Sequence, residues 1–176
     1  MGERLFDDGT TSSAVISDDG RYRYRLGRTW HDDLPYVVWI MLNPSTADAD
    51  TDDATIRRCT GFARQWQAGG IVVVNLFAYR TAYPTELKAA ADEGIDIVGE
   101  LNDEHIADAV FDPMTSLVVC AWGAGPGARR RAAAVHALVV EAMREPMCLG
   151  ITKKGDPTHP LYVANDRELV EWTLPS

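Results

Sequence analysis

The sequence predicts a single α/β domain in which a central, mainly parallel four-stranded sheet carries helices on both faces and follows an N-terminal β-hairpin. Four short apolar runs lack polar alternation, which is typical of strands that are buried on both faces. Segments with helical periodicity separate these runs. The length of 176 residues suits one compact domain, and no linker or internal repeat divides the chain. We therefore predict one domain over residues 1–176.

The first half of the chain predicts a hairpin, a buried strand and a helix, in that order. Residues 14–26 predict a hairpin at an antiparallel edge, because an apolar run at 14–16 and an Asp19-Gly20 turn precede Tyr22, Tyr24 and Leu26, which alternate with arginines. The run 36–42 is uniformly apolar and predicts the first buried strand. Apolar residues recur at helical spacing from Ile56 to Trp66, and Gly69-Gly70 predict the end of that helix.

The second half repeats the alternation of strand and helix. Pro84 is expected in the first turn of a short helix. The remaining predicted strands are 71–74, 116–121 and 147–151, and the remaining predicted helices are 102–111 and 128–144.

Composition and charge exclude several classes of protein. Hydrophobic residues make up 46% and charged residues 24%, which excludes a wholly disordered chain or a coiled coil. The net charge of −9 argues against extended, sequence-blind binding to duplex nucleic acid. Three cysteines without a C-x-x-C pair fit a reducing interior. We find no signal-like N-terminal segment and no apolar run long enough to span a bilayer, so we expect a cytoplasmic protein that contacts no membrane and needs no cofactor.

Polar clusters follow all four predicted buried strands. The clusters are Asn43-Pro44-Ser45, residues 75–80, residues 122–125 and Thr158-His159-Pro160. Open α/β sheets place their ligands at the carboxyl ends of parallel strands, which lie along one edge. The clusters therefore predict one composite site.

Two residues in these clusters have side chains that suit catalysis. The amide of Asn43 can orient a water molecule or a carbonyl group, although Asn-Pro also forms ordinary turns. His159 lies in a loop, where histidine can act as a general base or donate to developing negative charge, although many loop histidines are inert.

The glycine-rich turn 123–127 precedes a helix that opens with Arg129, Arg130 and Arg131. Backbone N–H groups at a helix start can hold an anion, so this turn predicts either a phosphate site or a plain tight turn. A dinucleotide site would need an acidic residue after the next strand, where Thr152 stands instead.

Four aspartates, Asp48, Asp50, Asp52 and Asp53, precede the first predicted helix. The loop does not match an EF-hand, because it lacks glycine at the sixth position and has Cys59 at the twelfth. Thr51, Asp52 or Asp53 is expected to cap the helix, with a metal role as the alternative. No histidine pair has zinc-ligand spacing, and the site residues we predict include no metal ligand.

The order of these motifs resembles a bacterial and phage family known as domain of unknown function 1643. The residues that carry the resemblance are 41–45, 75–80, 121–123 and 159–162, within a similarity that spans about residues 20 to 163. The same order resembles the uracil-DNA glycosylase superfamily, which implies a three-layer α/β/α fold. That resemblance gives Asn43 a water-positioning role, Asn75 base recognition and His159 stabilisation of the departing base anion. It also implies that Phe77 stacks on the base. Asn75 and Arg80 have the N-x-x-x-x-R spacing of some branches of that superfamily.

These observations lead to three functional hypotheses. The first is a glycosylase-like hydrolase that cleaves the N-glycosidic bond of a base in single-stranded nucleic acid, a nucleotide or a nucleoside. The second is a non-catalytic module that binds a nucleotide or modified base at the same edge. The third is metal-assisted phosphate hydrolysis by residues 48–53 with residues 129–131. We predict Asn43 and His159 as catalytic, and the predicted substrate contacts are Ser45, Asn75, Phe77, Arg80, Trp122, Gly123 and Arg129.

Overall fold

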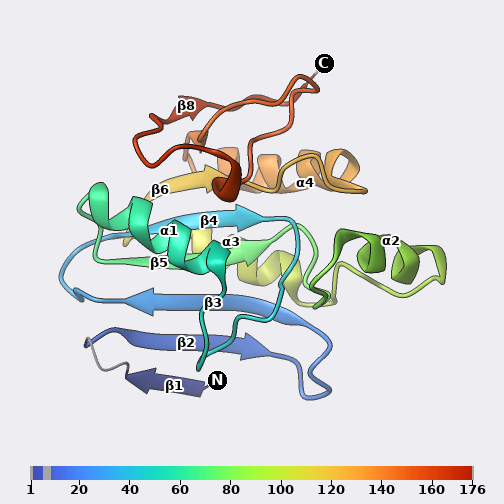
Figure 1. The fold of residues 1–176 in the computed structure, drawn as a ribbon, viewed down its shortest axis with the longest axis horizontal. Helices are drawn as coiled ribbons and strands as arrows, with labels where there is room; N and C mark the ends of the chain where they lie inside the picture. The colour runs from blue at the N-terminus through green and yellow to red at the C-terminus, as the bar shows by residue number, and fades with distance from the viewer. Residues whose placement is uncertain (1, 6–8, 176) are drawn as a thin grey trace.

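The computed structural model describes residues 2–5 and 9–175 and has a mixed α/β fold with one eight-stranded sheet (Figure 1). The strands are β1 (Gly2–Leu5), β2 (Thr11–Ile16), β3 (Arg23–Thr29), β4 (Tyr36–Met41), β5 (Gly70–Asn75), β6 (Thr115–Cys120), β7 (Pro146–Cys148) and β8 (Val170–Glu171). The helices are α1 (Ala54–Gln65), α2 (Pro84–Asp92), α3 (Asn102–Phe111), α4 (Ala128–Glu141) and the short 3₁₀ helix η1 (Pro160–Tyr162).

The four strands predicted as parallel are neighbours in the middle of the sheet. Strand order is β1-β2-β3-β5-β4-β6-β7-β8, and β5, β4, β6 and β7 run parallel to one another. The sheet is larger than the four strands predicted, because β3 pairs antiparallel with β5 and so joins the hairpin to the same sheet. The hairpin lies on the antiparallel side of the sheet as predicted, but β1 and not the hairpin is the outermost strand there. Strands β1 and β8 were not predicted, and both residues of β8 are exposed, so it carries no apolar pattern.

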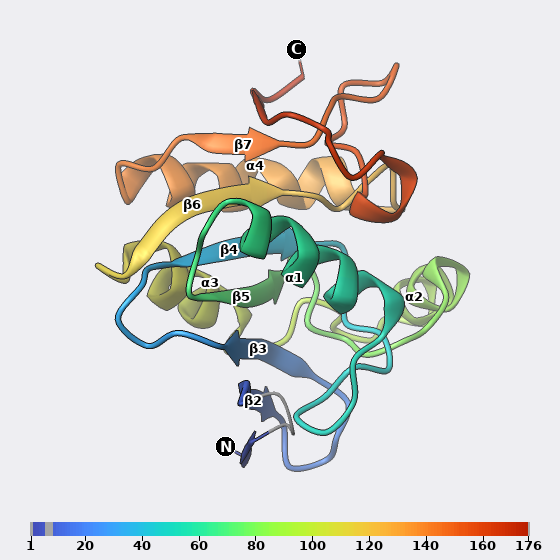
Figure 2. The ribbon, with the colours of Figure 1, turned by 60° about the vertical axis from the view of Figure 1, so that its left-hand side comes forward.

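Helices cover both faces of the sheet. Alternate residues of β4 point to opposite sides: Val38 and Ile40 pack in one core cluster, and Val37 and Trp39 in the other. Helices α3 and α4 contribute to the first cluster and α1 to the second, and Figure 2 shows α1 on the side of the sheet opposite α3 and α4. This burial on both faces explains why the strand sequences are apolar throughout.

Local signals set the helix ends close to where the sequence predicts them. Asp53 caps α1 by accepting a hydrogen bond from the N–H of Ile56 at 2.9 Å, which confirms capping by one of the three candidates. Pro84 opens α2 as expected. Helix α4 follows Gly127, whose φ of +74° lies in the left-handed region that favours glycine. In the described part of the chain, no helix is both long and apolar enough to cross a membrane.

Candidate functional site

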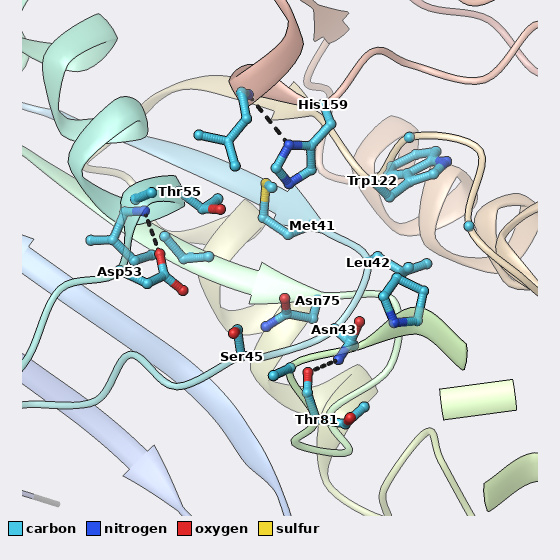
Figure 3. A pocket seen from close by; sticks show the side chains of 18 of the residues that line it. Met41, Leu42, Asn43, Ser45, Asp53, Thr55, Asn75, Thr81, Trp122 and His159 are labelled. Carbon is cyan, nitrogen blue, oxygen red and sulfur yellow. Dashed lines mark hydrogen bonds between the residues drawn. The ribbon is translucent and has the colours of Figure 1, made fainter. Parts of the chain in front are cut away.

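A cavity of about 510 Å³ opens at the carboxyl ends of the parallel strands, on the side of α1. Asn43, Asn75, Trp122 and His159 all line it, so the four predicted clusters converge as expected. Figure 3 shows their side chains arranged around the opening. The volume lies in the range of pockets that enclose small molecules.

The side-chain amide of Asn75 is buried beside the cavity. Asn75 is the last residue of β5, its side chain lines the cavity, and it is only 1% exposed. Neither its Nδ2 nor its Oδ1 has a hydrogen-bond partner among the described residues. An unsatisfied buried donor or acceptor costs about 1–3 kcal/mol. The amide therefore offers one donor and one acceptor direction to whatever fills the cavity.

The backbone at Asn75 is held from the opposite side of the sheet. Asn102, the first residue of α3, is fully buried, and its Nδ2 donates to the carbonyl oxygens of Asn75 at 3.0 Å and of Leu76 at 3.2 Å. Arg131 of α4 also donates to Leu76, from Nε at 3.0 Å. Neither contact is predicted from the sequence, because neither residue directly follows a strand.

Asn43 presents an acceptor to the cavity. Its Nδ2 donates to the backbone carbonyl oxygens of Thr81 at 2.9 Å and Pro44 at 3.0 Å. Because both partners can only accept, the orientation of the amide is fixed and Oδ1 is left free of these bonds. The N–H of Thr81 also donates to Pro44 at 3.0 Å, which ties the loop after β5 to the loop after β4.

His159 is half-buried and holds its proton on a defined nitrogen. Its Nδ1 accepts a hydrogen bond from the N–H of Leu161 at 3.3 Å, which places the proton of the neutral ring on Nε2. Burial lowers the pKa of His159 below its ordinary value of 6.5, an effect that the nearby Asp53 carboxylate opposes. At neutral pH the ring is therefore an uncharged donor.

Arg58 of α1 fixes the loop that carries His159. Its guanidinium donates to the carbonyl oxygens of Pro160 at 3.1 Å and of Val163. The same guanidinium lies 4.8 Å from the ring centre of Phe62, within cation–π range. Arg58 thereby fixes the loop that places His159 at the cavity.

The other predicted contacts divide into two groups. Ser45, Trp122 and Gly123 line the cavity. Phe77 lies in the hydrophobic core instead, and Arg80 donates to the carbonyl oxygen of Gly20 at 3.1 Å, both outside the cavity.

Arg129 also lies outside the cavity, in a separate hollow at the start of α4. Its Nε is 3.4 Å from Oδ1 of Asp156, and it also donates to the carbonyl oxygen of Lys154. Stacking by Phe77 and contacts from Arg80 or Arg129 would need a rearrangement, because none of these residues lines the cavity. A position at the end of a strand does not by itself decide which way a side chain points.

Arg23 lines the cavity and was not predicted. This first residue of β3 is 2% exposed, and its backbone N–H donates to the carbonyl oxygen of Ala78 at 2.9 Å, just beyond Asn75 on the neighbouring strand. The sequence signal was present as an arginine within an apolar alternation. That signal does not single out Arg23, because the sequence predicts an edge strand here, where arginine is common.

The aspartate-rich loop is occupied by protein contacts. Asp52 forms an ion pair with the buried Arg28 at 2.7 Å, and Asp48 accepts from the N–H groups of Asp50 and Thr51. Within residues 2–5 and 9–175, no three His, Cys, Asp or Glu side chains are grouped to hold a metal ion. The arginines at 129–131, which the third hypothesis combines with this loop, have partners elsewhere: Arg131 pairs with Asp103 on α3, and Arg129 with Asp156.

The fold and the cavity define an α/β protein with a cavity at the carboxyl edge of its sheet, which is lined by apolar side chains and by a few polar ones. Residues 23–161 match the family described as protein of unknown function (DUF1643), and the chain belongs to that family. No curated protein and no solved structure matches the chain.

Proposed function

We propose that this protein is a glycosylase-like hydrolase that binds a nucleobase in the strand-end cavity and cleaves its N-glycosidic bond. The observation that carries the proposal is the buried Asn75 amide, which has a free donor and a free acceptor beside the cavity. A nucleobase edge presents alternating donors and acceptors, and this pattern matches an amide. In the proposal, the helices on both faces of the sheet form the three-layer α/β/α arrangement of the uracil-DNA glycosylase superfamily.

Each polar group in the cavity has a separate task in this reaction. Asn75 binds the base edge, and the free Oδ1 of Asn43 accepts a hydrogen bond from the attacking water and so aims its oxygen. The water attacks the anomeric carbon as the carbon–nitrogen bond breaks. The departing base keeps the bonding electron pair, and the water proton passes to solvent.

His159 stabilises the base as it leaves. The neutral ring has its proton on Nε2, from which it can donate to the oxygen or nitrogen where negative charge develops. A donor that is fixed before the reaction needs no reorganisation during it. Loss of one such donor in other enzymes lowers kcat by about 10²–10³.

Chromatography of free base after incubation with nucleosides, nucleotides and single-stranded oligonucleotides tests the proposal. We expect the wild-type protein to release one base, and Asn43→Ala and His159→Ala to release it at least about 100-fold more slowly. Exposed residues outside the cavity supply matched controls, Asn165→Ala and His31→Ala, which should keep the wild-type rate. Full activity of Asn43→Ala and His159→Ala would refute the assigned roles. Binding without release would identify a binding module instead.

A further inference from the structure

Arg23 is a buried cation without an ion-pair partner within residues 2–5 and 9–175. Its Nη1 donates to the carbonyl oxygen of Ala47 at 2.6 Å, whereas its Nε is buried and has no partner among the residues that the structure describes. Burial lowers the pKa of Arg23 to about 10, so the guanidinium stays charged at neutral pH. A buried charge that lacks a counter-ion is costly in free energy.

The carboxylates of Asp53 and Asp48 partly oppose the lowering of the Arg23 pKa, but both are hydrogen-bonded elsewhere and neither forms an ion pair with Arg23. Asp53 caps α1, and Asp48 accepts from its own loop. Asp52 pairs with Arg28. Arg28 and Arg80, the nearby cations, further lower the pKa of Arg23. No ion pair joins Arg23 to any described carboxylate, so its charge is left for a ligand in the cavity.

The first residues of α1 line the same cavity. Ala54, Thr55 and Ile56 line it together with Arg23. Helix N-termini favour anions, because their first N–H groups lack helical acceptors. The carboxylate of Asp53 is also there and would repel an anion, although its Oδ1 is held by the Ile56 N–H.

We propose that Arg23 and the N-terminus of α1 bind the phosphate of a nucleoside monophosphate whose base lies against Asn75. This inference rests on the proposed function and names its substrate class. The guanidinium fork matches two phosphate oxygens, and a monoester carries a charge of about −1.5 to −2 at neutral pH. The end of β5 and the start of β3 adjoin, which places base recognition and phosphate recognition side by side.

Size and charge favour a mononucleotide over a polymer. A cavity of about 510 Å³ suits one nucleotide, and a net charge of −9 repels a polyanion that approaches the surface. A cation that is 2% exposed can neutralise a single enclosed phosphate, but it cannot follow an extended backbone.

Calorimetric titration compares each nucleoside with its own 3′- and 5′-monophosphate and with a single-stranded oligonucleotide. We expect wild-type protein to bind one monophosphate about 10- to 100-fold more tightly than its nucleoside. Arg23→Met should remove this preference, and Arg23→Lys should keep part of it. Arg25→Met, on the same strand but outside the cavity, is the matched control and should keep all of it.

Asp53→Asn supplies a second variant in case Arg23→Met does not fold. Asparagine also caps helices well, so this change removes a negative charge while it keeps the cap. It should tighten binding of the monophosphate and leave binding of the nucleoside unchanged.

Several outcomes would overturn the inference. These are equal affinity for nucleoside and monophosphate, a preference that survives Arg23→Met, tighter binding of the oligonucleotide than of any monophosphate, and no binding of any of these compounds. A preference for the monophosphate without base release would leave the inference standing and refute only the glycosylase activity.

Discussion

The side-chain amide of Asn102 donates to the backbone carbonyl oxygen of Asn75 at 3.0 Å. Asn102 begins α3, which packs on one face of the sheet, whereas α1, whose first residues line the cavity, packs on the other. Asn102 is fully buried at the start of α3. Its hydrogen bonds fix the end of β5, and the fixed backbone determines where the unpartnered amide of Asn75 lies. The cavity is therefore organised before any ligand enters it.

Replacement of Asn102 by alanine should weaken ligand binding as well as stability. The change leaves the carbonyl oxygen of Asn75 without its donor, and we expect a loss of about 1–3 kcal/mol in the free energy of unfolding. We also expect affinity for the nucleobase ligand to fall about 10-fold or more by calorimetry. Val139→Ala, a core truncation in α4, is the control for stability alone and should leave affinity unchanged. Equal affinities in both variants would show that Asn102 has only a structural role.

The activity of the protein should decline in acid because of His159. The folded-state pKa of His159 is lowered, so the neutral ring persists to pH values below the ordinary 6.5. Below the lowered pKa, the ring gains a proton on Nδ1 and can no longer accept from the Leu161 N–H. Nε2 keeps its proton, so we attribute the loss of activity to the loss of the hydrogen bond that orients the ring. Stability contributed by the neutral ring is thus present above pH 6.5 and is lost as pH falls through the lowered pKa.

A pH profile of base release checks this assignment. We expect an acidic limb with a midpoint below 6.5 in the wild-type protein. His159→Asn retains a donor but cannot titrate, so its residual activity should lack that limb. An unchanged limb in this variant would assign the titration to another group.

Two glycines near α1 should respond to alanine in opposite directions. A Cβ at Gly69 would overlap the carbonyl oxygen of His31 and lie 2.6 Å from that of Leu34, so Gly69→Ala should destabilise the protein by about 1–3 kcal/mol. Gly61 is exposed within α1 with open space around it, so Gly61→Ala should stabilise by about 0.5–1 kcal/mol. Thermal unfolding measures both, at about 2–4 °C per kcal/mol for a chain of this length. Equal shifts in the same direction would contradict the packing described at Gly69.

The sequence predicted most of what periodicity and strand ends determine. Strands β4 to β7, the starts of α2, α3 and α4, and the convergence of Asn43 with Asn75 and His159 all follow from apolar runs and their terminal residues. The position of β3 beside β5 could not be predicted, because antiparallel pairing across a long connection leaves no local pattern. Because this pairing was not predicted, the sequence did not indicate that Arg23 lies near Asn75 at the cavity. The same limit hid the orientation of Phe77, since whether a residue after a strand faces the core or the cavity depends on helices far along the chain.

Release of free base by wild-type, Asn75→Ala and Asn75→Asp proteins is the most direct test of the central claim, which is that the unpartnered amide of Asn75 recognises a nucleobase for cleavage. We predict that the wild-type protein releases one base and that Asn75→Ala lowers kcat/KM at least about 100-fold, because the alanine has no donor or acceptor for the base edge. Asn75→Asp, which cannot donate when ionised, should also lose activity towards that base. Wild-type kcat/KM in both variants, or no base released by the wild-type protein from any substrate, would contradict the claim.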